Sequence, residues 1–268
     1  MKYQKQDLQN WRIFRIKNCL KKITVLLSFI FCCLGFSGCA AFRSAPEYNL
    51  LKQDKNSIRK ALNENYSGIK SLYGRAKISF SDAENRSQSS GLIYYKISDS
   101  LFITLEGAIG ETEAVLFLRP DSFFVENYYD KFTVQDLRSA FSLRRIGGPD
   151  LPFEDLKYSL YGYEPIKEDF ILTGITEEFI TLKNPVSPSR WQEIKVNKNL
   201  VIEEVKGYYN DQLEYLKQYD FFFYQNDHYL PTRIVFKKAS PPEKLTIFFE
   251  KLELDRYYQP DYHKQGEK

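Results

Sequence analysis

The stretch FITLEGAIGETEAVLF, residues 102–117, consists of two apolar runs that flank a short turn containing glycine and glutamate. Each run has the length of a β-strand, and the turn between them is short enough for a hairpin. Similar apolar runs follow one another along most of the chain, at a spacing typical of an antiparallel sandwich or barrel. This rhythm predicts a mostly β protein with about eleven to thirteen strands.

The predicted strands are rich in β-branched and aromatic residues and are separated by polar turns. They cover residues 72–80, 91–97, 100–106, 113–119, 121–129, 131–135, 169–175, 177–183, 189–196, 200–209, 215–224, 229–238 and 243–254. Two or three helices are also expected. One lies within residues 52–69, where Ile58, Leu62 and Ile69 recur at helical spacing. Another lies in a helical interlude at about 136–162.

Several predicted strands are apolar on both faces. Val115 and Phe117 alternate with Leu116 and Leu118, so neither face of that strand is polar. An antiparallel sheet with one face in water would alternate apolar and polar residues. Both faces are therefore covered, and 16% of the chain is aromatic. A large aromatic core and a lipid-filled interior would both explain this pattern, and composition alone favours the core.

The first 39 residues have the organisation of an export signal. Residues 1–22 carry seven Lys and Arg against one Asp, and residues 23–36 are uncharged and apolar. This apolar run is too short to span a bilayer as a helix, so a signal peptide is favoured over a buried amphipathic helix. The exit, Ser37-Gly38-Cys39, resembles a bacterial lipobox. It predicts cleavage before Cys39 and lipid attachment to its thiol, with an ordinary signal peptide as the alternative.

These features divide the chain into four predicted parts. Residues 1–38 are the signal peptide, and residues 39–51 hold the lipidated cysteine and a tether. Residues 52–255 form the single domain, and residues 256–268 form a polar tail. All four cysteines lie in the first 39 residues, so the exported domain can form no disulfide.

Charge and motifs argue against several classes of function. After the predicted signal peptide, 31 Lys and Arg face 34 Asp and Glu, which disfavours a nucleic-acid partner. The chain has only two histidines, and it contains no nucleophile elbow, P-loop or dinucleotide fingerprint. We therefore expect no catalytic residues, no metal site and no cofactor, and hence no enzyme.

Three segments resemble the LolA/LolB superfamily, in particular the LolB-type outer-membrane lipoprotein receptors, over about Ile58 to Leu254. Residues 71–76 (SLYGRA) follow the opening helix, as the family's first strand does. Residues 109–113 (IGETE) resemble a loop between two apolar strands. Residues 147–165 (GGPDLPFEDLKYSLYGYEP) resemble a proline-containing segment that leads into a short helix ending in glycine.

The resemblance implies a curved antiparallel sheet that forms an incomplete, half-open β-barrel, with two or three helices as a lid. It implies a monomeric, lipid-anchored receptor or chaperone on the periplasmic face of the bacterial outer membrane. Such a protein would take acylated lipoproteins from a LolA-like periplasmic carrier into a hydrophobic cavity. Two alternatives stay open: a lipid-anchored scaffold or sensor subunit that binds a protein partner without a lipid cavity, and a carrier of another lipid.

The resemblance also implies a protruding loop, with Ile109 and Gly110 at its tip, that contacts the membrane. The alternative is that Ile109 folds back on its own sheet. Arg75 is either a polar partner of the lid or a surface cation. Strand alternation assigns the following residues to the cavity, although a register change of one residue would exchange the faces: Ile78, Ile103, Leu105, Val115, Phe117 and Phe124, with Leu156 and Leu160 on the lid.

Overall fold

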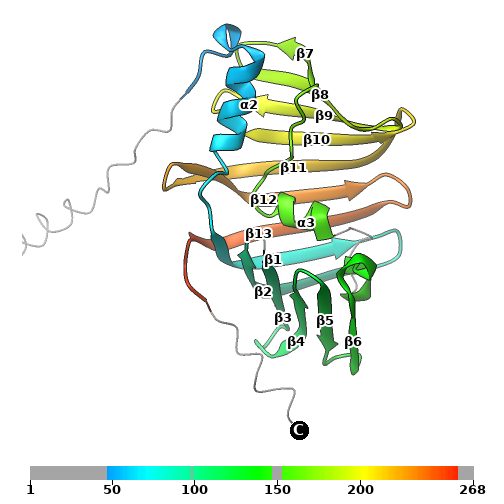
Figure 1. Cartoon of the computed structure of the whole chain (residues 1–268). Coiled ribbons are helices and arrows are strands. Elements are labelled where there is room, and N and C mark those ends of the chain that lie inside the picture. The colour runs from blue at the N-terminus through cyan, green and yellow to red at the C-terminus, as the bar shows by residue number, and fades with distance from the viewer. Residues whose placement is uncertain (1–46, 98, 147–152, 259–268) are drawn as a thin grey trace, which may run out of the picture. The chain divides into compact units, whose positions relative to one another are not determined.

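The computed structural model describes residues 47–97, 99–146 and 153–258, and these contain one antiparallel sheet of 13 strands (Figure 1). Along the sheet the order is β6-β5-β4-β3-β2-β1-β13-β12-β11-β10-β9-β8-β7. In Figure 1, strands β3–β6 run across the direction of β8–β13, so the sheet is open and strongly curled. The predicted fold class, a mostly β half-open barrel with helices over its mouth, is confirmed.

The strand bounds agree closely with the predicted runs. They are β1 Ser71–Ser81, β2 Arg86–Lys96, β3 Ser100–Glu106, β4 Thr112–Leu118, β5 Ser122–Asn127, β6 Phe132–Leu137, β7 Ile171–Ile175, β8 Phe179–Ser187, β9 Arg190–Asn197, β10 Ile202–Tyr209, β11 Gln212–Gln225, β12 His228–Lys238 and β13 Glu243–Leu254. The main difference lies in β2, which already begins at Arg86, because the turn before it is only four residues long. Asp82 closes that turn by accepting the backbone N–H groups of Glu84 and Asn85.

Two α-helices and three short 3-10 turns accompany the sheet in the described residues. The bounds are η1 Leu50–Lys52, α2 Lys55–Glu64, η2 Arg138–Ala140, η3 Leu143–Ile146 and α3 Phe153–Ser159. Helix α2 begins at its N-cap Asp54, whose carboxylate accepts the Ser57 N–H at 2.9 Å. It ends earlier than predicted because the Asn65 side chain pairs with the backbone of Tyr229 in β12.

The chain between β6 and β7 crosses the concave face of the sheet. Strands β6 and β7 are its two edges, so the connection must run from one edge to the other. Figure 1 shows α3 in front of the central strands and the chain after it rising past β11 to β8. We call residues 138–146 and 153–170 the lid. The residues between these two ranges, which begin the third family-like segment, lie outside the described part of the chain.

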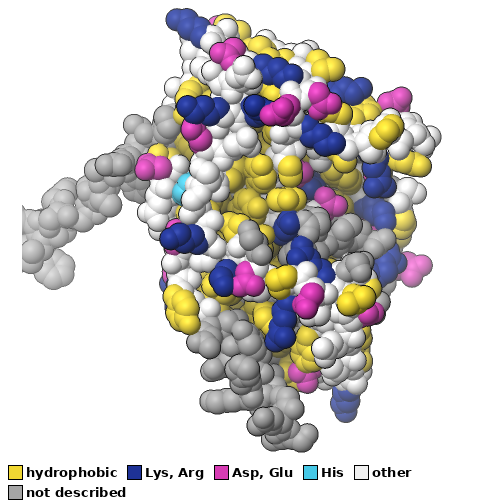
Figure 2. Space-filling model, in the orientation of Figure 1, with side chains coloured by type: hydrophobic (Ala, Val, Ile, Leu, Met, Phe, Trp, Pro, Cys, Tyr) yellow, Lys and Arg dark blue, Asp and Glu magenta, His cyan; other side chains and the backbone are white. Residues whose placement is uncertain are grey.

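Both faces of the sheet are indeed covered, but very unequally. The concave face carries the main core, to which α2 adds Ile58 and Leu62. On the convex face, Tyr94, Phe102 and Phe117 form a small aromatic cluster. Tyr258 packs against Tyr94 at 5.4 Å between ring centroids and covers this cluster. Figure 2 shows apolar side chains in the middle of the concave side, with charged side chains around them.

Candidate functional site

An apolar cavity lies between the lid and the concave face of the sheet. Its volume is about 70 Å³. The sheet contributes branched and aromatic side chains from β1, β3 and β13, and the lid contributes one leucine from η3 and one from α3. The lining consists of Ile78, Phe80, Ser87, Ser89, Ile103, Leu105, Leu143, Leu156, Leu245 and Ile247.

The strand register explains why these side chains converge. Ile78 of β1 lies opposite Ile247 of β13 on one side and Ser89 of β2 on the other. Residues directly opposite one another in antiparallel strands point to the same face of the sheet. Phe80 and Leu245 form the next such pair on that face, two residues along. Strands β13, β1 and β3 thus present apolar side chains to the lid, and β2 places Ser87 and Ser89 between β1 and β3.

The structure brings together part of the predicted cavity set. Ile78, Ile103, Leu105 and Leu156 all line the cavity. Leu160 is fully buried in the same core, beside the cavity.

Val115, Phe117 and Phe124 lie on the convex face, in or against the aromatic cluster, which corrects their predicted position. The physical reason is the register of the β3–β4 hairpin. Leu105 pairs with Ala114, and a bulge follows, so Ala114, Leu116 and Leu118 are the residues of β4 that point inward.

A wider polar vestibule of about 640 Å³ adjoins the apolar cavity. Phe80, Ser87, Ser89 and Leu105 line both spaces, so one continues into the other. The rest of the vestibule is mainly polar and comes from the β1–β2 turn, β2, β4, β5, the β5–β6 turn, β13 and the lid. These lining residues include Asp82, Asn85, Gln88, Glu113, Asn127, Tyr129, Arg144 and Glu243.

Two exposed apolar side chains stand at neighbouring hairpin tips on the vestibule side of the sheet. Ile109, in the β3–β4 turn, is 92% exposed, which excludes the alternative that it folds back on the sheet. Gly110 has φ +84°, and its N–H donates to the Gly107 carbonyl, so the turn is tightly closed. Tyr129, in the β5–β6 turn, is 81% exposed. The Tyr128 N–H donates to the Glu113 carbonyl at 2.8 Å and links the two hairpins.

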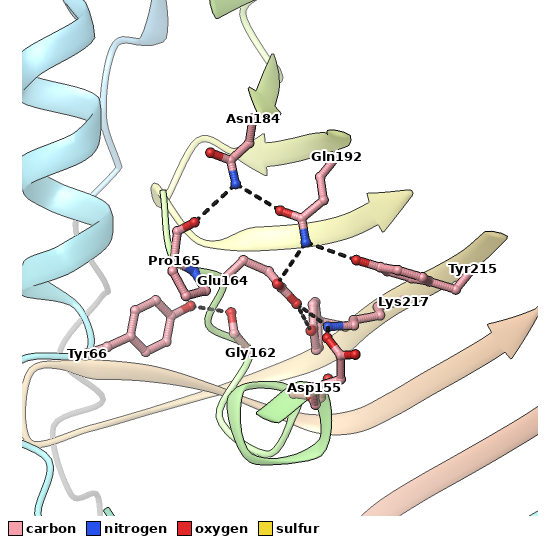
Figure 3. A network of polar contacts seen from close by, with 11 residues as sticks. Tyr66, Asp155, Gly162, Glu164, Pro165, Asn184, Gln192, Tyr215 and Lys217 are labelled. Carbon is pink, nitrogen blue, oxygen red and sulfur yellow. Dashed lines mark hydrogen bonds and ion pairs between the residues drawn. The ribbon is translucent and has the colours of Figure 1, made fainter. Parts of the chain in front are cut away.

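A buried polar network holds the far end of the lid on the sheet (Figure 3). Lys217 of β11 is fully buried, and its Nζ lies 2.6 Å from Glu164 Oε1 and 3.4 Å from Asp155 Oδ1. Gln192 of β9 donates to the other Glu164 oxygen and to the Tyr215 hydroxyl. Burial alone would lower the pKa of Lys217. The facing Glu164, with Tyr219 and Asp155, outweighs it and raises this pKa well above its usual value.

Further hydrogen bonds fix the backbone that follows α3. Asn184 donates to the Pro165 carbonyl at 3.0 Å and accepts from the Lys167 N–H. The Tyr66 hydroxyl, next to α2, donates to the Gly162 carbonyl at 2.7 Å. At the other end of the lid, Arg144 of η3 pairs with Glu243 of β13 at 2.5 Å. The lid is thus held by polar contacts at both ends and by apolar packing in its middle.

Several residues of this site were not predicted from the sequence. Phe80 and Leu245 could have been found from strand alternation. Phe80 lies two residues from the predicted cavity residue Ile78, and Leu245 lies two residues from Ile247, which pairs with Ile78. Lys217 carries a weaker signal: it is in phase with Tyr215 and Tyr219, at an inward position where a lysine is unusual. Arg75 lies on the convex face and pairs with Glu106, so it is a surface cation.

The described residues show no metal cluster and no membrane-spanning helix. No group of three or more His, Cys, Asp and Glu side chains in that part of the chain is arranged to hold a metal ion. No helix described here is long and apolar enough to cross a membrane. Cys39 and the predicted signal peptide lie outside the described residues.

Comparison with known proteins identifies the fold. No protein-family model and no curated protein matches the chain. Among solved structures, a DUF1329 family protein from Desulfovibrio piger is 15% identical, with a TM-score of 0.56, and the match covers 78% of this chain and 95% of that one. A LolA superfamily protein from Nitrosomonas europaea is 15% identical, with a TM-score of 0.52, and the match covers 77% and 94%.

A third match is a proposed outer membrane lipoprotein-sorting protein domain from Vibrio parahaemolyticus. It is 11% identical, with a TM-score of 0.53, and the match covers 75% of this chain and 92% of that one. At these identities the likeness concerns the fold alone. The chain therefore has a LolA/LolB-like fold, and its function has to be argued from its own cavity, lid and loops.

Proposed function

We propose that this protein binds the acyl chains of lipoproteins or other lipids between its sheet and its lid, and delivers them to a membrane. The observation that carries this proposal is an apolar cavity that continues into a polar vestibule, beside two exposed apolar hairpin tips. An amphiphile needs both an apolar and a polar environment. The exposed tips provide a surface that a lipid interface would cover.

The size of the cavity implies that the lid moves during binding. About 70 Å³ is far below the roughly 300–1,000 Å³ that is typical of small-molecule sites. Leu143 and Leu156 of the lid fill the space that an acyl chain would take. When the lid rises, these leucines leave the sheet, and the ligand replaces them against Ile78 and Ile103. The described structure thus corresponds to a closed position of the lid.

The finer proposal is a LolB-type receptor. A protein lipidated at Cys39 would be held at the periplasmic face of the outer membrane and would accept lipoproteins from a soluble periplasmic carrier. The solved relatives with a LolA superfamily or lipoprotein-sorting description support this choice at the level of fold. Transfer of this kind needs no catalytic residue, because the cargo moves according to its relative affinity for carrier, receptor and membrane. We therefore propose a role without enzymatic activity.

Lipid binding can be tested on residues 46–268, which form a compact unit with its own core. The unit would be purified from a lipid-containing host and studied by native mass spectrometry, followed by titration with a fluorescent acyl probe. We expect copurified lipid, or saturable probe binding that an acylated peptide displaces. An unliganded mass without probe binding would reject the proposal and favour a lipid-anchored scaffold with a filled core.

Delivery can be tested separately through Ile109. We expect Ile109→Glu to leave folding and lipid binding unchanged, because the side chain is 92% exposed and contacts no core. Transfer of a bound fluorescent lipoprotein to liposomes should slow several-fold, since a charge at the tip opposes entry into a lipid interface. Ile171→Glu is the matched control, because Ile171 is 59% exposed on the distant edge strand β7. Equal transfer rates for the two variants would argue against membrane contact by this tip.

A further inference from the structure

The charged residues of the vestibule come from four separate elements. Asp82 belongs to the β1–β2 turn, Glu113 to β4, Arg144 to η3 and Glu243 to β13. Three carboxylates thus face one guanidinium in the described lining. Arg144 pairs with Glu243, whose side chain is only 6% exposed, so these two charges offset each other. The lining keeps an excess of negative charge beside the opening of the apolar cavity.

The two remaining carboxylates, Asp82 and Glu113, are held in place by hydrogen bonds. Asp82 Oδ1 accepts the backbone N–H groups of Glu84 and Asn85 at 2.8 and 2.7 Å. These backbone hydrogen bonds lower the pKa of Asp82, with a smaller contribution from Arg144. Glu113 accepts a hydrogen bond from the Ser89 hydroxyl at 3.4 Å, across the boundary between cavity and vestibule. Both charges therefore border the place where the polar end of a bound chain would emerge.

We propose that this vestibule receives the polar end of the bound amphiphile and selects uncharged or positively charged ends over anionic ones. This inference rests on the proposed function, and it narrows the ligand class. Amide N–H and ammonium groups can donate to the carboxylates, and ester and amide carbonyls can accept hydrogen bonds from the side-chain amides of Asn85 and Gln88. A carboxylate or phosphate would meet Asp82 and Glu113, and the one cation among the described lining residues, Arg144, already pairs with Glu243.

Competition between ligands of equal chain length measures how the polar end affects binding, because the contribution of the alkyl chain is the same for each ligand. Residues 46–268 would be loaded with N-phenyl-1-naphthylamine, an uncharged fluorescent probe of apolar sites. Dodecanoate, N-dodecylacetamide and dodecylammonium would then displace it at pH 7.5, below their micelle concentrations. We expect the amide and the ammonium compound to displace the probe about tenfold more effectively than the carboxylate. High salt should reduce this preference, because the Debye length falls to about 3 Å at 1 M.

Two conservative substitutions assign the preference to the vestibule. Asp82→Asn keeps the oxygen that closes the turn, and Glu113→Gln keeps an acceptor for Ser89. The double variant should bind all three competitors with similar affinity. Glu250→Gln is the matched control, because Glu250 pairs with Lys77 on the sheet surface outside the vestibule, and it should keep the wild-type preference.

The outcomes distinguish this inference from the proposed function. Equal displacement by all three compounds in the wild type would overturn the vestibule assignment while leaving acyl binding intact. A preference that survives in the double variant would also overturn it. A failure of the wild type to bind the probe, or to release it to any competitor, would reject the proposed function together with the inference.

Discussion

At the residue scale, Lys217 is the least expected side chain of the site. A lysine is almost never fully buried unless it is paired, and this one lies under the lid with Glu164 against it at 2.6 Å. Burying both charges costs solvation that their attraction only partly returns. The main effect of the Lys217–Glu164 pair is to fix the position of the lid, because it holds the residues after α3 over β11. Lys217 therefore helps to hold the lid against the sheet.

Replacement of Lys217 should destabilise the fold strongly, because it leaves a buried carboxylate without its cation. We expect Lys217→Met to lower the free energy of unfolding by about 3–5 kcal/mol, since Glu164 then stays buried without its cation. The double variant Lys217→Met, Glu164→Gln should recover part of this loss. Urea denaturation would measure both. Lys206→Met is the control: its ion pair with Glu193 is solvent-accessible, and a loss of about 0–1 kcal/mol is expected. A single-variant cost no larger than that of the control would contradict the argument.

The sequence predicted the face of the sheet correctly for some strand residues and wrongly for others. Ile78 could be assigned to the cavity because β1 alternates apolar and polar residues, and Ile103 and Leu105 because Thr104 and Glu106 alternate with them in the second half of β3. Val115 and Phe117 were assigned to the wrong face, because β4 is apolar on both sides and periodicity cannot choose between them. The choice depends on the bulge after Leu105, a feature of pairing between two strands. The polar residues of the vestibule were missed for a related reason, as they meet only when distant turns come together.

At the element scale, the lid is the part of the fold that decides access to the cavity. Helix α3 has only seven residues, which is too short to be stable alone. It is kept by Leu156 and Leu160 on the sheet and by the Asp155 and Glu164 contacts to Lys217. Strand rhythm predicted the sheet well, but it could not show that β6 and β7 are the edges. That arrangement sends the lid across the concave face.

Shortening one lid leucine should open the site. Leu156→Ala is expected to cost about 2–5 kcal/mol and to enlarge the cavity. An acyl probe should then bind faster and at least as tightly, because less of the lid has to leave the sheet. Leu62→Ala in α2 removes an equally buried leucine from the same core without lining the cavity. Stopped-flow binding and urea denaturation of both variants separate access from stability. Equal binding rates in the two variants would argue against the lid as the gate.

At the scale of the whole molecule, the vestibule and the first described residues lie at opposite ends of the strands. The Tyr48 N–H donates to the Lys198 carbonyl at the β9–β10 turn. The vestibule lies beside the β1–β2 turn and the exposed tips, at the other end of the sheet. This polarity could not be read from hydrophobic periodicity, which specifies faces and not ends. If residues 39–51 are the tether that the sequence predicts, it joins the domain at the end opposite the vestibule.

The core as a whole is rich in buried tyrosines, and this predicts how stability depends on pH. Burial raises the pKa of Tyr215 to about 12, and it also raises the pKa values of Tyr66, Tyr161 and Tyr219. Unfolded tyrosine titrates near pH 10. Because the folded pKa values are the higher ones, their contribution to stability is complete below about pH 10. It is lost as the pH rises from there toward the folded values. Lys217, whose pKa is also raised, acts in the same direction.

The buried tyrosines and Lys217 should therefore change the free energy of unfolding little between pH 7 and 9. Above pH 10, this free energy should fall steeply. Absorbance at 295 nm should show one class of tyrosines that ionises freely and a second that ionises only as the circular dichroism signal is lost. Tyr215→Phe removes one group that ionises only on unfolding. The variant should therefore unfold at a higher pH than its stability at neutral pH alone would predict. Tyr257→Phe, at an 83% exposed position, should leave the midpoint unchanged. If all tyrosines ionised together near pH 10 in the folded protein, the core would be open to water and the closed lid would be wrong.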